Sequence, residues 1–172
     1  MTFLIRKSRP TDIVHLQSIE ASAAKAFKSI DKLRWLADSD GMTIDMHQHA
    51  LDQGLSWVAV ESSSQLPIGF LTARSIEDDF FIEEVSVSEP HQKKGVGTKL
   101  IENTLEEAKL LGKLAATLTT FREVPWNAPY YNKLGFITLE LDVLPIYLKN
   151  ILEAEEKAGL PINLRCAMRR AL

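Results

Sequence analysis

Residues 92–97, Gln-Lys-Lys-Gly-Val-Gly, have the composition of an anion-binding turn. They stand between a strand-like run at 78–90 and a helical run at 98–112. A glycine-bearing turn at such a junction exposes backbone N–H groups, and the helix dipole adds partial positive charge there. Glycine lets a bulky anion approach the backbone, and Lys93 and Lys94 add mobile positive charge. The stretch therefore predicts a phosphate or pyrophosphate site.

Two common phosphate motifs do not fit these residues. The P-loop pattern G-x-x-x-x-G-K-[ST] fails because Gly95 and Gly97 are too close together and the lysine is misplaced. The dinucleotide fingerprint G-x-G-x-x-G fails because its third glycine is missing. A third pattern, Q/R-x-x-G-x-G/A, is satisfied at every defined position from Gln92 to Gly97.

Two further stretches fit patterns that accompany this loop in one superfamily. Upstream, Glu84, Val85 and Val87 match E-[LIV]-x-V. Downstream, the pattern A-x-x-Y-x-K-x-G-F is matched by Ala128, Tyr131, Lys133, Gly135 and Phe136. With the loop, these motifs give a chain that resembles the GCN5-related N-acetyltransferases, the GNAT superfamily, over residues 3–172. One departure is Asn127, since many members carry this asparagine two residues further upstream.

The resemblance implies a fold and a co-substrate. The fold is α+β, layered α/β/α, with a mixed, mostly antiparallel sheet of about seven strands, splayed at a coenzyme cleft. Residues 3–172 would form a single domain. The co-substrate is acetyl-CoA, whose pantetheine arm pairs with the main chain of Val85 and Val87. Its pyrophosphate lies on the N–H groups of the loop, and Asn127 also reaches the coenzyme. The loop residues are Gln92, Lys93, Lys94, Gly95, Val96, Gly97 and Thr98.

The resemblance also gives a role to a tyrosine, and strand alternation selects a candidate base. Tyr131 matches the tyrosine that protonates the leaving thiolate, although a core aromatic is the alternative. Strand alternation places Glu83 and Glu84 on opposite faces, and Glu83 shares its face with Val85 and Val87, which are expected to point into the core. Glu84, with Ser86, is therefore the preferred base, acting through water. Glu83 and water itself remain alternative bases, and Glu84 alternatively binds a cationic acceptor.

Composition and periodicity supply the elements that hold these residues. Strands are expected at 3–8, 56–61, 68–75, 78–90, 114–120, 136–141 and 162–170. Helices are expected at 12–27, 98–112, 126–135 and 146–159, and in an interrupted region at 31–54. No repeat, low-complexity tract or linker divides the sequence.

The whole chain excludes several protein classes. A net charge of −3 over 172 residues argues against a general nucleic-acid binder. No apolar run approaches the roughly 20 residues of a membrane span, so a cytoplasmic protein without a membrane partner is expected. Cys166 is the single cysteine, which excludes an internal disulfide. His47-Gln-His49 lacks the additional ligands of a metal site, so no metal is expected.

These expectations point to an acetyl-CoA-dependent N-acetyltransferase that acts on a primary amine of a small molecule or a protein. The alternative is a non-catalytic acyl-CoA-binding module with the same fold. The acceptor amine would be framed by residues 11–53, the strand at Glu84 and the C-terminal segment. The helix at 148–159 and the last strand offer the edges of a homodimer.

Overall fold

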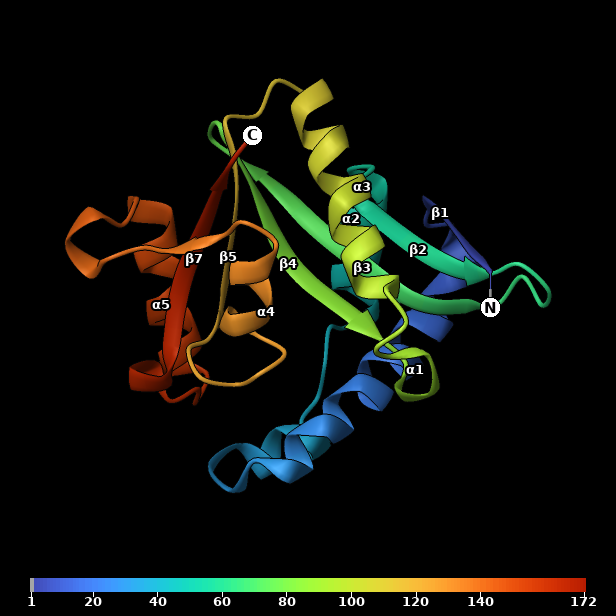
Figure 1. The fold of residues 1–172 in the computed structure, drawn as a ribbon, viewed down its shortest axis with the longest axis horizontal. Coiled ribbons are helices and arrows are strands. Elements are labelled where there is room, and N and C mark those ends of the chain that lie inside the picture. The colour runs from blue at the N-terminus through green and yellow to red at the C-terminus, as the bar shows by residue number, and fades with distance from the viewer. Residues whose placement is uncertain (1) are drawn as a thin grey trace. The chain divides into compact units, whose positions relative to one another are not determined.

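The strands form one mixed sheet in the computed structural model, which describes residues 2–172 (Figure 1). Its order is β1-β2-β3-β4-β5-β7-β6. The pair β4–β5 is parallel, whereas β1–β2, β2–β3, β5–β7 and β6–β7 are antiparallel. The seven-stranded, mostly antiparallel sheet confirms the expected fold class. The strands are β1 (Phe3–Lys7), β2 (Ser56–Glu61), β3 (Pro67–Ile76), β4 (Asp79–Val87), β5 (Ala115–Phe121), β6 (Ile137–Thr138) and β7 (Arg165–Ala171).

Helices occupy most of the segments between the strands. The α-helices are α1 (Ile13–Ala24), α2 (Ile44–Asp52), α3 (Val96–Leu110), α4 (Ala128–Lys133) and α5 (Ile146–Lys157). The 3-10 helices are η1 (Pro10–Asp12), η2 (Lys25–Ser29), η3 (Asp31–Asp38), η4 (Glu89–His91), η5 (Leu141–Val143) and η6 (Ile162–Leu164). Within residues 2–172, no helix combines the length and the apolarity needed to cross a bilayer.

The chain is organised in two compact units. Unit 1 comprises Met1–Arg74 and Glu84–Glu106, and unit 2 comprises Ser75–Glu83 and Glu107–Leu172. The strand β4 contributes its first residues to unit 2 and its last residues to unit 1. The expected splay of the sheet and the expected single domain both concern how the units are arranged, and both stay predictions.

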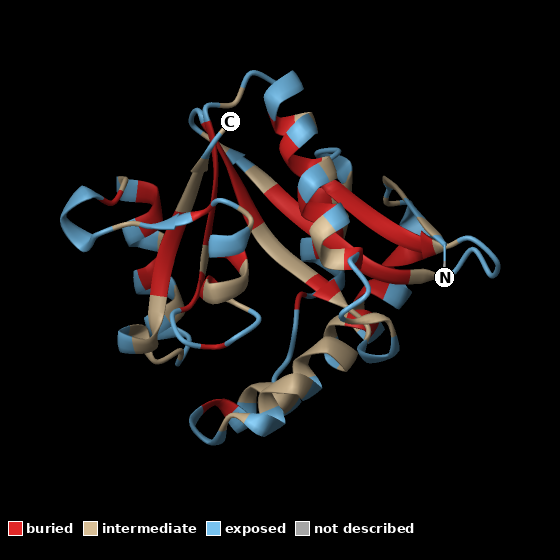
Figure 2. Ribbon diagram, in the orientation of Figure 1, coloured by how far each residue is buried: buried red, intermediate tan, exposed pale blue. Residues whose placement is uncertain are grey.

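In unit 1, helices cover both faces of the strands β2 and β3. Leu16 of α1 belongs to a buried cluster with Val58 and Phe70, which are register partners on adjacent strands. Gly69 points the other way, and a Cβ at that position would lie 3.2 Å from Val96 of α3. Figure 2 shows the buried residues concentrated along these strands. The two faces therefore have different neighbours, α1 and α2 on one and α3 on the other.

In unit 2, a polar network lies inside an apolar core. The helix α5 packs its buried side chains, among them Leu148, against Phe81 of β4 and Ala167 of β7. The hydroxyl of Tyr147 donates to Asp79 Oδ2 at 2.8 Å and lies 2.8 Å from Thr117 Oγ1. Arg169 Nη1 lies 3.2 Å from Asp79 Oδ1. One hydroxyl thus joins α5 to two strands of the sheet.

Several elements differ from their expected lengths. The first helix ends at Ala24 instead of residue 27, and tighter 3-10 turns follow it. The strand expected at 136–141 is reduced to Ile137–Thr138, whose residues are exposed, before the chain turns into η5. The last strand begins at Arg165, because the N–H of Leu164 bonds to Pro161 O in a turn.

Candidate functional site

The segment from Ser88 to Val96 holds the predicted anion loop by its own hydrogen bonds. The N–H of Ser88 bonds to Ile68 O at 3.0 Å, which ties the end of β4 to β3. Gln92 Nε2 donates to Val87 O at 3.0 Å, and Lys94 Nζ donates to Pro90 O at 2.8 Å. The glutamine that opens the motif therefore anchors the loop to the preceding strand.

The backbone of this loop takes conformations that favour glycine. Gly95 has φ +82° and Lys93 has φ +59°, both in the left-handed region. A Cβ built on Gly95 would meet nothing within 4 Å, so the space above this residue is open. The helix α3 begins at Val96, and the first N–H groups of a helix have no partner inside it. The loop thus leads into a helix N-terminus, and its role in binding an anion stays a prediction.

The end of β4 follows the predicted alternation. Ser86 Oγ donates to Glu84 Oε1 at 2.7 Å, which places both side chains on one face. Val87 points to the opposite face, where its Cγ2 lies 3.3 Å from the Cβ position of Gly69. Val85 and Val87 are only half-buried, whereas Ser86 is buried. Glu84 therefore lies on the face of the strands that carries α1 and α2.

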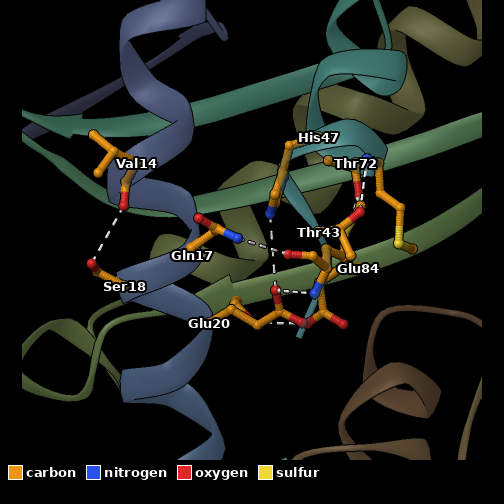
Figure 3. Close-up of polar contacts among 11 residues, drawn as sticks. Val14, Gln17, Ser18, Glu20, Thr43, His47, Thr72 and Glu84 are labelled. Carbon is orange, nitrogen blue, oxygen red and sulfur yellow. Dashed lines mark hydrogen bonds and ion pairs between the residues drawn. The ribbon is translucent and has the colours of Figure 1, made fainter. Parts of the chain in front are cut away.

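That face holds a polar cluster that the sequence did not reveal. Glu20 of α1 accepts the N–H of Met42 at 3.0 Å through Oε2. His47 of α2 is fully buried, and its Nε2 lies 3.9 Å from the same oxygen. Gln17 Nε2 donates to Met42 O at 3.3 Å. Figure 3 draws Glu20, His47 and Glu84 in one close-up. In the sequence, His47 stands out only as part of the pair His47-Gln-His49, and His49 is exposed.

Burial shifts the pKa values of this cluster in opposite directions. Burial raises the pKa of Glu20, although the N–H of Met42 partly opposes the rise. Burial lowers the pKa of His47, whose ring stands edge-on to Phe70 at 5.2 Å between centroids. Each shift favours the neutral form of its side chain.

In unit 2, the predicted tyrosine lies on a short helix whose two ends are fixed. Asn127 occupies the N-cap position of α4, and its carbonyl accepts the N–H groups of Tyr130 and Tyr131 at 2.9 and 3.0 Å. Its side chain makes no capping hydrogen bond. At the other end, Gly135 has φ +85°, and Arg170 Nη1 donates to Leu134 O at 2.6 Å. The last residues of the tyrosine motif therefore end this helix.

The ring of Tyr131 is packed against two aromatic side chains. It lies 5.8 Å from Phe136 and 5.4 Å from Tyr130 between centroids, and the residue is 7% exposed. The N–H of Phe136 also bonds to Tyr131 O at 3.1 Å. A buried ring with a fixed backbone can hold its hydroxyl in one direction.

The predicted residues thus fall into two groups. Glu84, Val85, Val87 and the loop from Gln92 to Thr98 belong to unit 1, whereas Asn127 and Tyr131 belong to unit 2. Each group has the local structure that its motif predicts, and the catalytic and coenzyme-binding roles stay predictions. Among residues 2–172, no group of three or more His, Cys, Asp and Glu side chains could hold a metal ion.

Solved acetyltransferases share this fold at low sequence identity. PaiA N-acetyltransferase from Thermoplasma acidophilum, in complex with coenzyme A, is 16% identical with a TM-score of 0.73, covering 100% of both chains. Ribosomal-protein-S18-alanine N-acetyltransferase from Escherichia coli is 16% identical with a TM-score of 0.65, covering 99% of this chain and 94% of that one.

A larger enzyme contains the same fold as one part. N-acetylglutamate synthase from Neisseria gonorrhoeae, complexed with coenzyme A and N-acetyl-glutamate, is 15% identical with a TM-score of 0.72. The match covers 100% of this chain and 35% of that one.

A family model gives the assignment that the low identities leave open. The model of the acetyltransferase (GNAT) family matches residues 18–136, which include the glycine loop, the strand at Glu84 and the tyrosine motif. These are the segments that carry the resemblance in the sequence. The chain therefore belongs to the acetyltransferase (GNAT) family.

Proposed function

We propose that this protein transfers the acetyl group of acetyl-CoA directly to a primary amine. The observation that carries the proposal is the loop from Gln92 to Thr98, with its left-handed Gly95 and the start of α3 at Val96. A helix N-terminus reached through a glycine loop stabilises a pyrophosphate without needing a side chain. The match to the GNAT family and the coenzyme A in two of the similar structures support acetyl-CoA as the co-substrate.

The reaction needs one bond to form and one to break. The amine nitrogen attacks the thioester carbonyl carbon, the N–C bond forms, and the C–S bond breaks. Glu84, through a water molecule, receives the proton that the amine loses. Tyr131 gives its proton to the departing thiolate, which becomes the thiol of coenzyme A. Holding the amine beside the thioester replaces a bimolecular encounter, which supplies much of the rate enhancement.

The electrostatic roles follow from the local structure of each residue. The hydrogen bond from Ser86 fixes the carboxylate of Glu84 at 2.7 Å. The edge-on packing of Tyr131 on Phe136 restrains the ring that carries the hydroxyl. A N–H of β4 near Val85 polarises the carbonyl as negative charge builds on its oxygen. A homodimer built on α5 and β7 remains a prediction.

The first test is coenzyme binding. Gly97 lies in the first turn of α3, and Gly97→Glu puts bulk and negative charge where the pyrophosphate would lie. Titration calorimetry should then detect no binding of acetyl-CoA. Leu110→Glu is the matched control. It adds the same charge in the last turn of the same helix, where Leu110 is 87% exposed. Acetyl-CoA that binds Gly97→Glu as tightly as wild type would refute the assignment of the loop.

The second test separates an enzyme from a binding module. The wild-type protein is incubated with acetyl-CoA and a panel of primary amines, and the thiol of coenzyme A is detected as it is released. Release that depends on the amine supports the transferase. Tight acetyl-CoA binding without amine-dependent release across the panel would instead support the non-catalytic module.

A further inference from the structure

Glu20 is a largely buried carboxylate without a Lys or Arg partner among the described residues. Its side chain is 16% exposed, and its Oε2 accepts the N–H of Met42. In the part of the chain that the structure describes, no Lys or Arg lies within ion-pair distance of Glu20, and His47 Nε2 lies 3.9 Å from its Oε2. Buried carboxylates are normally paired with a cation, because desolvation penalises an isolated charge.

His47 is the second unusual side chain of this cluster. It is fully buried, and within residues 2–172 neither ring nitrogen has a hydrogen-bond partner. The 3.9 Å from Nε2 to Glu20 Oε2 is longer than a hydrogen bond. An unpartnered polar group in the interior costs about 1–3 kcal/mol, so its presence calls for an explanation. If a bound cation kept Glu20 charged, a small movement of either side chain would let the Nε2–H of His47 donate to the carboxylate.

Gly41 leaves room for the carboxylate of Glu20. A Cβ on Gly41 would lie 2.5 Å from Glu20 Cδ and 2.6 Å from Oε2. Any side chain at position 41 would therefore push the carboxylate out of its place. The absence of a side chain here lets Glu20 rest against the backbone that leads into α2.

We propose that Glu20, with His47 behind it, binds a second, non-reacting positive charge of the amine acceptor. Glu20 makes the contact with the acceptor, and His47 positions the carboxylate. This inference rests on the proposed function, and it narrows the acceptor to primary amines that carry another cationic group. The missing cation of Glu20 is then supplied by the acceptor.

The non-reacting charge suits Glu20 better than the reacting amine does. A carboxylate that holds an ammonium group stabilises its protonated form, which has no lone pair for attack. The reacting amine must lose its proton, and Glu84 takes that role in the proposed mechanism. Two carboxylates on the same face of the strands thus divide the work, one for the proton and one for the fixed charge (Figure 3).

The experiment compares diamines with amino alcohols. Protein loaded with coenzyme A is titrated with α,ω-diaminoalkanes of three to six carbons and with the amino alcohols of the same lengths. We expect wild type to bind one diamine about 10- to 100-fold more tightly than its amino alcohol, as charge-assisted hydrogen bonds do. The preference should disappear in Glu20→Gln, which keeps an oxygen for the N–H of Met42.

Two variants and one spectrum sharpen the test. Gly41→Ala should also remove the preference for the diamine, because the added methyl group displaces the carboxylate of an unchanged Glu20. Asp45→Asn is the control, since it removes one exposed charge in the first turn of α2 and should keep the preference. The imidazole ¹⁵N resonances of His47 should shift when the diamine binds wild type and stay unchanged in Glu20→Gln.

The outcomes separate this inference from the proposed function. Equal affinity for each diamine and its amino alcohol, no measurable binding of any diamine, or a preference that survives in Glu20→Gln would each overturn the inference. Amine-dependent thiol release with equal efficiency for both kinds of amine would overturn it while the transferase stands. If the wild-type protein does not bind acetyl-CoA, the proposed function itself is overturned.

Discussion

Removing only the hydroxyl of Tyr131 separates a general acid from a core aromatic. Tyr131→Phe keeps the ring that packs on Phe136 and Tyr130 at 5.8 and 5.4 Å. A lost hydrogen bond costs about 0.5–1.5 kcal/mol of unfolding free energy. For a chain of this length, that corresponds to a fall in Tm of roughly 1–6 °C. A purely structural hydroxyl would change nothing more.

A general acid predicts a much larger effect on turnover. Proton donation contributes about 10²–10⁴-fold, or roughly 3–5 kcal/mol of transition-state stabilisation. Because the proton moves only in the transition state, kcat should fall by that factor while the affinity for acetyl-CoA stays unchanged. The assay is amine-dependent thiol release, read beside calorimetric titration of acetyl-CoA and thermal unfolding.

Tyr130→Phe is the internal control for this prediction. Tyr130 lies beside Tyr131 on the same short helix and is half-buried, so Tyr130→Phe should keep most of the activity. If Tyr131→Phe turns over like wild type, another group or bulk water protonates the thiolate. The assignment of Tyr131 would then be wrong, although the fold and the coenzyme loop would stand.

Two further predictions concern stability and reactivity. Burial alone would raise the pKa of Asp12, but the hydrogen bonds from Arg6 and from the N–H of Arg9 outweigh it and hold the pKa below its usual range. The stability from this ion pair is therefore full above about pH 3.9 and is lost as the pH falls through the lower, folded pKa. Asp12→Asn should cost about 1.5–3 kcal/mol in urea unfolding at pH 7, and the difference from wild type should narrow at pH 3; a constant difference would contradict the linkage. Burial raises the pKa of the Cys166 thiol, so a disulfide reagent should label it only as fast as the protein unfolds, and rapid labelling of the native protein would show otherwise.

The sequence predicted the parts of the site that depend on local structure. The loop at Gln92 was predictable because glycine spacing and a helix start act over a few residues. The shared face of Glu84 and Ser86 was predictable because side chains alternate along a strand. The end of the tyrosine helix at Gly135 follows from the same local rules.

The sequence did not predict contacts that arise from packing. Glu20 stands 21 positions before Gly41 and 27 positions before His47, and it meets them because α1 and α2 pack on one face of β2 and β3. No spacing rule links such positions. The strand expected at 136–141 is shorter than predicted for a related reason. Its apolar residues alternate as in a half-buried strand, but packing leaves Ile137 64% exposed.

The network around Tyr147 has a consequence for how the chain folds during synthesis. Tyr147 lies 68 positions after Asp79, and Arg169 lies 90 positions after it. Closing such long loops is entropically costly, and folding that depends on distant contacts is slow. Because Tyr147 and Arg169 come so much later in the chain, the first residues of β4 leave the ribosome long before these partners of Asp79 are synthesised. Until α5 and β7 emerge, Phe81 lacks Leu148 and Ala167, against which it packs, and its side chain is exposed to aggregation. A chaperone that holds this segment would raise the yield of folded protein.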